Sequence, residues 1–153
     1  MEALPTGAVL VVVGDGPQRA ALEAQAAGLE DRVRFAGNQR DVVPWLQALD
    51  IFALPSYANE GVPQALLQAM LVGLPCVTTN VGSIAELALA DVTALVVPPQ
   101  DAQALQDSLQ KLMRDTALRA RLGEAARRHC AERFSYERML DRMEAIYRAA
   151  AGR

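Results

Sequence analysis

The sequence predicts a doubly wound α/β fold, in which helices cover both faces of a parallel sheet, followed by a helical tail. Short apolar runs rich in Val and Ile alternate with amphipathic stretches over the first hundred residues. Gly, Pro or Asp residues bound these runs, and after Pro98 and Pro99 the alternation stops. Continuous apolar runs are typical of strands that are buried on both faces, as the strands of parallel sheets are.

Five of the apolar runs are expected to form strands, because each is short and is bounded by turn residues. They are residues 8–13, 33–36, 51–54, 76–79 and 94–97. Amphipathic stretches fill the connections, as crossover helices do, and the last connection has room only for a short helical turn. The expected helices and the turn are residues 17–27, 41–48, 63–71 and 84–89.

The C-terminal third is expected to be helical throughout. Three segments have helical spacing of their apolar residues, and each is preceded by a residue that can accept a hydrogen bond as an N-cap. The segments are residues 102–114, 116–131 and 136–149, and the caps are Asp101, Asp115 and Ser135. Their leucines are expected to face the core, namely Leu105, Leu109, Leu112 and Leu122.

We expect a single domain, with a leader over residues 1–7, an α/β core over 8–99 and the helical tail over 100–153. A chain of 153 residues buries roughly two-thirds of its unfolded surface and needs no disulfide or structural metal. No apolar run approaches the ~18 residues of a membrane span, and no basic segment precedes an apolar one as in a secretory signal.

The charge pattern argues against nucleic-acid and anionic membrane partners, since 15 Lys and Arg residues are interspersed with 18 Asp and Glu residues. Cys76 and Cys130 stand far apart without a CxxC motif, which argues against a metal site and favours a reducing cytoplasm. His129, the single histidine, is expected on a solvated face of the helical tail. We therefore expect no metal and no catalysis by histidine.

Ligands of open α/β sheets bind at the carboxyl ends of the strands, so the loops that follow the strands are the candidate sites. Gly14 to Pro17 follow the first strand, and two glycines and a proline there predict a tight turn into a helix. A dinucleotide site is disfavoured at this turn, because the third glycine of that fingerprint is missing and Arg19 stands at its place.

The loop and helix over residues 55–70 are the most informative stretch. Gly61 leaves backbone N–H groups accessible at the positive end of a helix, which suits a phosphate. Glu60 would repel a bare phosphate, but its carboxylate can accept hydrogen bonds from sugar hydroxyls. A phosphate joined to a sugar satisfies both. Gln68 lies roughly 12 Å along the helix from Glu60, so the two side chains can straddle a diphosphate.

Over about residues 8 to 147 the sequence resembles the C-terminal domain of the retaining GT-B glycosyltransferases of family four, also called group 1. The motifs of that domain appear here in the family's order. They are GDGP at 14–17, RVRFAG at 32–37, DIFALPS at 50–56, the loop-helix with Glu60 and Gln68, GLPCVTT at 73–79, GSIAEL at 82–87, ALVVPP at 94–99 and FSYE at 134–137.

The resemblance implies a Rossmann-like domain that is one half of a GT-B fold and binds a nucleoside-diphosphate sugar. Glu60 would be the catalytic residue and would accept hydrogen bonds from the transferred sugar, while the loop after Phe35 would contact the base. The family has a glutamate that accepts from the ribose at the position of Gln68, and an amide there predicts weaker ribose binding. The implied donor-binding residues are Gly14, Gly16, Gly37, Glu60, Gly61, Val62, Pro63 and Gln68.

The implied function is transfer of a hexosyl-type sugar from a nucleoside diphosphate to an acceptor, in cell-envelope polysaccharide synthesis, with the nucleotide sugar as substrate and no separate cofactor. An N-terminal domain would bind the acceptor, and an opening strand and helix would hold the diphosphate with an arginine and a lysine. Neither has a match in this sequence. We therefore expect this chain alone to bind rather than catalyse.

The expected location is the cytoplasm, with any peripheral contact with the inner face of the membrane made by the missing half. Two alternatives remain open. One is a non-catalytic nucleotide-binding or interaction module, in which Gln68 marks a lost transfer activity. The other is a phosphate-sugar isomerase or epimerase with a related two-domain fold.

Overall fold

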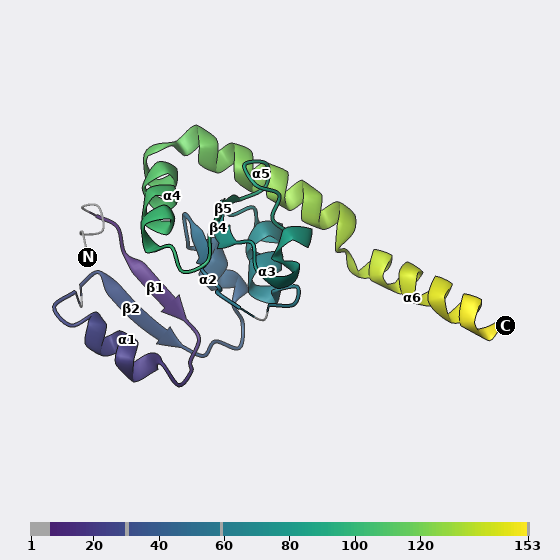
Figure 1. Cartoon of the computed structure of the whole chain (residues 1–153), viewed down its shortest axis with the longest axis horizontal. Coiled ribbons are helices and arrows are strands. Elements are labelled where there is room, and N and C mark those ends of the chain that lie inside the picture. The colour runs from purple at the N-terminus through teal and green to yellow at the C-terminus, as the bar shows by residue number, and fades with distance from the viewer. Residues whose placement is uncertain (1–6, 30, 59, 153) are drawn as a thin grey trace. The chain divides into compact units, whose positions relative to one another are not determined.

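The computed structural model describes residues 7–29, 31–58 and 60–152 (Figure 1). The expected leader lies outside these ranges except for Gly7, and so does Asn59 of the loop before the third helix. The chain divides into two compact units, Met1–Val42 and Val43–Arg153. Each unit is described by itself.

The first unit contains β1 (Leu10–Val13), α1 (Arg19–Gln25) and β2 (Val33–Gly37). The two strands are parallel, and Leu10 pairs with Val33. A register shift between Val12 and Val13 places Val13 opposite Gly37. Helix α1 is shorter than expected at both ends, because Pro17 and Gln18 form a turn before it and the chain leaves the helix before Gly28, whose φ is +84°.

The second unit begins with short helices and strands that alternate along the chain. They are α2 (Val43–Gln47), β3 (Phe52–Leu54), α3 (Gln64–Val72), β4 (Cys76–Thr79), the 3₁₀ segment η1 (Gly82–Glu86) and β5 (Leu95–Val97). The three strands form a parallel sheet in the order β3-β4-β5. All four residues of the central strand β4 are buried, as expected for a parallel strand with neighbours on both sides.

Three helices follow the sheet: α4 (Ala102–Arg114), α5 (Thr116–Arg133) and α6 (Tyr136–Ala151). The three predicted N-caps are confirmed. The Asp101 carboxylate accepts from the Ala104 N–H at 2.9 Å and the Asp115 carboxylate from the Leu118 N–H at 2.8 Å, and the Ser135 hydroxyl accepts from the Arg138 N–H at 3.3 Å. These bonds satisfy donors that the first turn of each helix leaves without intrahelical partners.

The core of the second unit lies between its sheet and the helices α4 and α5. Its cluster of buried residues is Val77, Leu95, Val97, Leu112, Leu118 and Leu122, with Leu105 and Leu109 partly buried against it. The predicted core leucines are thereby confirmed. Gly123 lets α5 approach the end of α3, since a Cβ at Gly123 would collide with the carbonyl oxygen of Gly73.

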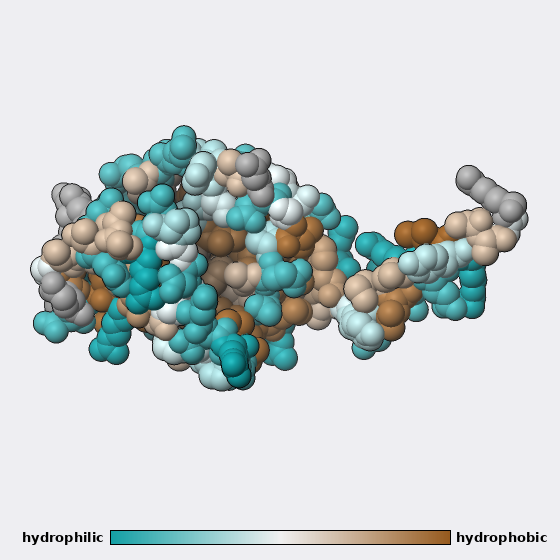
Figure 2. All heavy atoms as spheres, turned by 90° about the horizontal axis from the view of Figure 1, so that it is seen from below, coloured by the Kyte–Doolittle hydropathy of each residue, from teal (hydrophilic) through white to brown (hydrophobic). Residues whose placement is uncertain are grey.

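Helix α6 buries none of its 16 residues, a property that it shares only with the much shorter α1 among the described α-helices. Its large apolar residues repeat at helical spacing and remain exposed, which Figure 2 shows as hydrophobic colour along this helix. They are Tyr136, Met139, Leu140, Met143, Ile146 and Tyr147. The helix is held by local interactions, among them an ion pair of 2.6 Å between Arg148 and Glu144.

The α/β class, the parallel strands and the helical C-terminal end are confirmed. The strands pair as β1-β2 in the first unit and as β3-β4-β5 in the second. Apolar periodicity identifies strands but carries no information on which edges pair. Within the described ranges, no helix is long and apolar enough to span a membrane.

Candidate functional site

Two connections of the second unit, the one from β3 to α3 and the one from β4 to β5, meet at Glu60. The Ser56 hydroxyl, beyond the end of β3, donates a hydrogen bond of 2.5 Å to Oε1 of Glu60. The backbone N–H of Ser83, in η1, donates to the carbonyl oxygen of Glu60 at 3.1 Å. Both the side chain and the main chain of this half-buried residue are therefore held, and its carboxylate has a defined position.

Two buried threonines at the end of β4 hold the segment that carries Ser56. Thr78 Oγ1 donates to the carbonyl oxygen of Leu54 at 3.0 Å, and Thr79 Oγ1 donates to that of Ser56 at 2.6 Å. The parallel register places Thr78 opposite Leu54, so both bonds cross from one strand end to the next. Two threonines at the end of an otherwise apolar strand are the sequence signal for this support.

Gly82 lets η1 approach Glu60 closely. Its φ is +55°, in the left-handed region, and a Cβ at this position would lie inside the contact distance of the Glu60 carbonyl oxygen. A residue with a side chain would therefore push η1 away and lengthen the Ser83 to Glu60 hydrogen bond. The first residue of the GSIAEL motif thus makes a close approach to the candidate catalytic residue.

The start of α3 lies directly after Glu60. Pro63, the N-cap, is buried and extended, and it supplies no side-chain cap to the helix. The first turn of α3 contains no acidic residue, and Gly61 before it is exposed. The positive end of this helix is consequently not neutralised by a carboxylate of its own first turn, which leaves it suited to an oxyanion.

Gln68 is on the second turn of α3 and its side chain is exposed. Among the described residues, no hydrogen bond joins Gln68 to Glu60 or to any other side chain. The structure thus places Glu60, Gly61, Val62 and Pro63 in the loop between β3 and α3. Gln68 lies farther along the chain, on α3.

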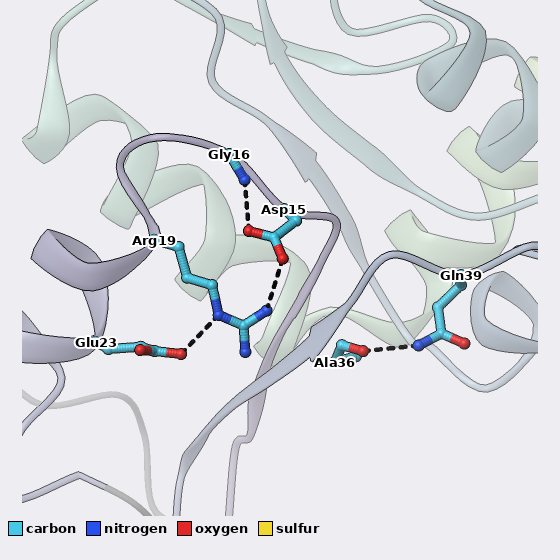
Figure 3. Close-up of polar contacts among 6 residues, drawn as sticks. All are labelled: Asp15, Gly16, Arg19, Glu23, Ala36 and Gln39. Carbon is cyan, nitrogen blue, oxygen red and sulfur yellow. Dashed lines mark hydrogen bonds and ion pairs between the residues drawn. The ribbon is translucent and has the colours of Figure 1, made fainter.

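The other predicted donor-binding residues lie in the first unit, in the turns after β1 and β2, and Figure 3 shows the polar contacts within each of these turns. The Gly14 N–H donates to the carbonyl oxygen of Gly37 at 2.8 Å. The side chain of Asp15 turns back to accept from the Gly16 N–H at 2.8 Å. Gly14, Gly16 and Gly37 therefore do form one paired set of turns at the carboxyl ends of two parallel strands.

Arg19 fixes this pair of turns. Its Nε donates to Glu23 at 2.8 Å and its Nη1 donates to Asp15 at 3.3 Å, and the hydrogen bond and charge of Glu23 are the main reasons why the pKa of Arg19 is raised. A Cβ on Gly37 would lie 3.3 Å from Arg19 Nη1, so the guanidinium lies over Gly37. Gln39 closes the second turn by donating to the carbonyl oxygen of Ala36 at 2.7 Å.

His129 is not on a solvated face as expected. It is half-buried, its Nε2 lies 3.3 Å from the carbonyl oxygen of Glu86, and its ring is tilted against that of Phe134. The short η1 segment reaches back onto α5, a contact between elements that α5's own periodicity does not encode. Within the described ranges, no group of three or more His, Cys, Asp and Glu residues is arranged to hold a metal ion.

Comparison with known proteins places the chain in a family. Residues 2–115 match the family described as glycosyl transferases, group 1. The chain belongs to the group 1 glycosyl transferases. It is 34% identical over 142 residues to N-acetyl-alpha-D-glucosaminyl L-malate synthase of Bacillus anthracis, a match over 92% of this chain and 37% of that protein. It is 35% identical over 127 residues to the lipopolysaccharide core biosynthesis mannosyltransferase LpcC of Rhizobium leguminosarum, over 83% and 36%.

Solved structures agree with this assignment. Anabaena HepE in complex with UDP-glucose matches with a TM-score of 0.89 and 27% identity, over 95% of this chain and 42% of HepE. The C-terminal domain of the group 1 family protein LpcC from Francisella tularensis matches with a TM-score of 0.74 and 27% identity, over 84% of this chain and 70% of that one. The chain is thus a C-terminal domain of the family. It spans about a third of the length of the curated relatives that it matches.

Proposed function

We propose that this group 1 domain binds the nucleoside-diphosphate sugar for a retaining sugar transfer, and that Glu60 is the residue that engages the transferred sugar. The observation that carries the proposal is the position of Glu60. Its carboxylate is oriented by Ser56 immediately before the uncapped positive end of α3. A hydroxyl acceptor next to an oxyanion site suits a sugar joined to a phosphate.

In this proposal the N–H groups at the start of α3, close to Gly61 and Val62, stabilise the charge that develops on the diphosphate as the sugar leaves. Gln68 would contact the ribose, and Gly14, Gly16 and Gly37 of the first unit remain predicted donor-binding residues. The nucleotide sugar is the substrate, and no separate cofactor is required. Two relatives named above support the proposal, since one is a mannosyltransferase and HepE was solved with UDP-glucose.

In the complete protein, the acceptor would be bound by the part that corresponds to the segments of the relatives outside the match. Transfer itself is therefore proposed for the complete protein, and donor binding for this chain. The names of relatives such as the lipopolysaccharide mannosyltransferase support a role in cell-envelope glycoconjugate synthesis.

Calorimetric titration of the chain with UDP, GDP and ADP, and with their sugar conjugates, tests donor binding. We expect one base to be preferred and the sugar conjugate to bind more tightly than the free diphosphate. The Glu60→Ala variant should lose the additional affinity due to the sugar and keep that for the diphosphate. Glu124→Ala, which removes an exposed carboxylate of α5, is the matched control and should bind as the wild-type chain does.

The same variants in the complete enzyme test the catalytic role. Glu60→Ala should lower turnover at least about tenfold, the loss of one strong hydrogen bond in the transition state. Unchanged turnover would remove Glu60 from the site. An affinity gain from the sugar that survives in Glu60→Ala would contradict the proposal as well.

A further inference from the structure

A small cavity lies at the C-terminal end of η1, beside Ala85 and Glu86. It has a volume of about 150 Å³ and is bordered by η1, the last turn of α5 and the second turn of α6. Its polar lining residues are Glu86, His129, Arg133 and Arg142, and its apolar ones are Ala85, Leu89 and Phe134. The described donor-site residues are not among them.

The two arginines of this cavity are unpaired. Arg19, Arg128 and Arg148 each form an ion pair with a carboxylate four residues away on the chain. In contrast, neither Arg133 nor Arg142 forms a hydrogen bond or an ion pair with any described residue, although Glu86 lines the same cavity. Two guanidinium groups from different helices thus line one cavity, and neither forms an ion pair with Glu86 or with another described carboxylate.

The third basic group is the imidazole of His129. Its Nε2 lies 3.3 Å from the carbonyl oxygen of Glu86. A carbonyl oxygen can only accept, so this hydrogen bond requires a proton on Nε2 and fixes the ring beside Phe134. His129 and Arg133 line the cavity from α5 and Arg142 lines it from α6, while Ala85, Leu89 and Phe134 form the apolar part of the lining.

We propose that this cavity is a binding site for a phosphate group, held between Arg133 and Arg142. A guanidinium group can donate two parallel hydrogen bonds to phosphate oxygens. Two arginines balance the charge of a phosphate dianion. A carboxylate ligand carries a single charge and would balance only one of the two arginines. The volume of about 150 Å³ holds a phosphate group, since a water molecule occupies about 30 Å³ of liquid. Glu86 is the one acidic side chain in the lining and weakens the site by repulsion.

The proposal is tested by titrating the chain with inorganic phosphate at constant ionic strength, while following backbone and arginine side-chain NMR signals. We expect saturable shifts at residues 129–134 and at the Nε–H groups of Arg133 and Arg142. The same titration is repeated with glycerol phosphate and with acetate. Shifts with glycerol phosphate as well as phosphate would indicate a monoester site, and saturation by acetate alone would overturn the choice of phosphate.

Removing a basic or an acidic group from the cavity should change phosphate affinity in opposite directions. Arg133→Gln and Arg142→Gln should each weaken phosphate binding about tenfold or more, because each removes a charge-assisted hydrogen bond. Glu86→Gln should strengthen it about two- to fivefold, because a repelling charge is lost. Arg128→Gln, an exposed arginine of α5 that is paired with Glu124, is the control and should change nothing. Equal weakening in Arg128→Gln, or no saturable shift in the folded wild-type chain, would overturn the proposal.

Discussion

The Ser56 hydroxyl lies 2.5 Å from Oε1 of Glu60 and donates a hydrogen bond to it. No described residue donates to Oε2. An ionised carboxylate has acceptor capacity on both oxygens, so one oxygen is used to orient the group and the other is available to a ligand. The carbonyl oxygen of the same serine accepts from Thr79, which ties the pair to the end of the central strand.

Replacing Ser56 with alanine should therefore disturb the orientation of Glu60 and leave the rest of the site in place. We expect Ser56→Ala to reduce the affinity gained from the sugar about five- to tenfold, in the range of one hydrogen bond to a charged group, with the affinity for the free diphosphate retained. Calorimetry on the chain measures both quantities. Ser108→Ala, on α4, is the matched control, and an equal loss for the free diphosphate would contradict a role in orienting Glu60.

Gly82→Ala should destabilise the second unit by about 2 kcal/mol or more, because the new methyl group collides with the Glu60 carbonyl and the backbone has a positive φ. Urea denaturation gives the free energy of unfolding. Gly61→Ala has open space and no positive φ, so its free energy of unfolding should change by less than about 0.5 kcal/mol. Similar losses in both variants would mean that the close approach of η1 to Glu60 is unimportant.

Gln68→Glu tests whether this exposed residue of α3 faces a ribose. A carboxylate can accept from both ribose hydroxyls, whereas the amide offers one acceptor, so the preferred nucleotide should bind about threefold or more tightly. The gain should be smaller for the 2′-deoxy form of that nucleotide. Equal affinity of wild type and variant for the ribonucleotide would place Gln68 outside the site.

The two buried cysteines predict a pH dependence of stability. Burial raises the pKa of Cys130 to about 11 and raises that of Cys76 as well. In the unfolded chain a thiol ionises near pH 8.5, so between roughly pH 8.5 and 11 the unfolded state binds fewer protons than the folded one. Stability is complete below that range and falls as the pH rises through it, by at most about 1.4 kcal/mol per pH unit for each thiol.

Urea denaturation at several pH values between 7 and 10 measures this slope. The Cys130→Ala variant removes one of the two thiols, and its free energy of unfolding should fall less steeply with pH than that of the wild-type chain. A slope that is identical in the two proteins would show that Cys130 ionises equally in both states.

The sequence was sufficient to predict the order and type of most helices and strands, and to select the loop between β3 and α3 as a candidate site. Strand β4 and helix α4 begin and end at the predicted residues, and the three N-caps lie where short polar side chains precede helical periodicity. These features depend on neighbours along the chain, which a sequence displays directly. Glu60 could be selected for the same reason, since the residues that define its place, Gly61 and Pro63, are adjacent to it.

Relations between distant residues could not be predicted. The bonds from Thr79 to Ser56 and from Ser83 to Glu60 join segments more than twenty residues apart, and they depend on strand register. The contact of His129 with Glu86 has the same origin. Periodicity specifies which face of an element is apolar, but the partner of that face is decided by the three-dimensional packing.

Helix α6 buries none of its 16 residues, and this has a consequence for how the chain responds to heat. An isolated helix of about this length is marginal in water, because nucleation is unfavourable and only local bonds repay it. Far-ultraviolet circular dichroism should therefore decline gradually well before the environment of Trp45 changes. A single melting temperature fitted to the helical signal would average two processes, fraying of α6 and cooperative loss of the core.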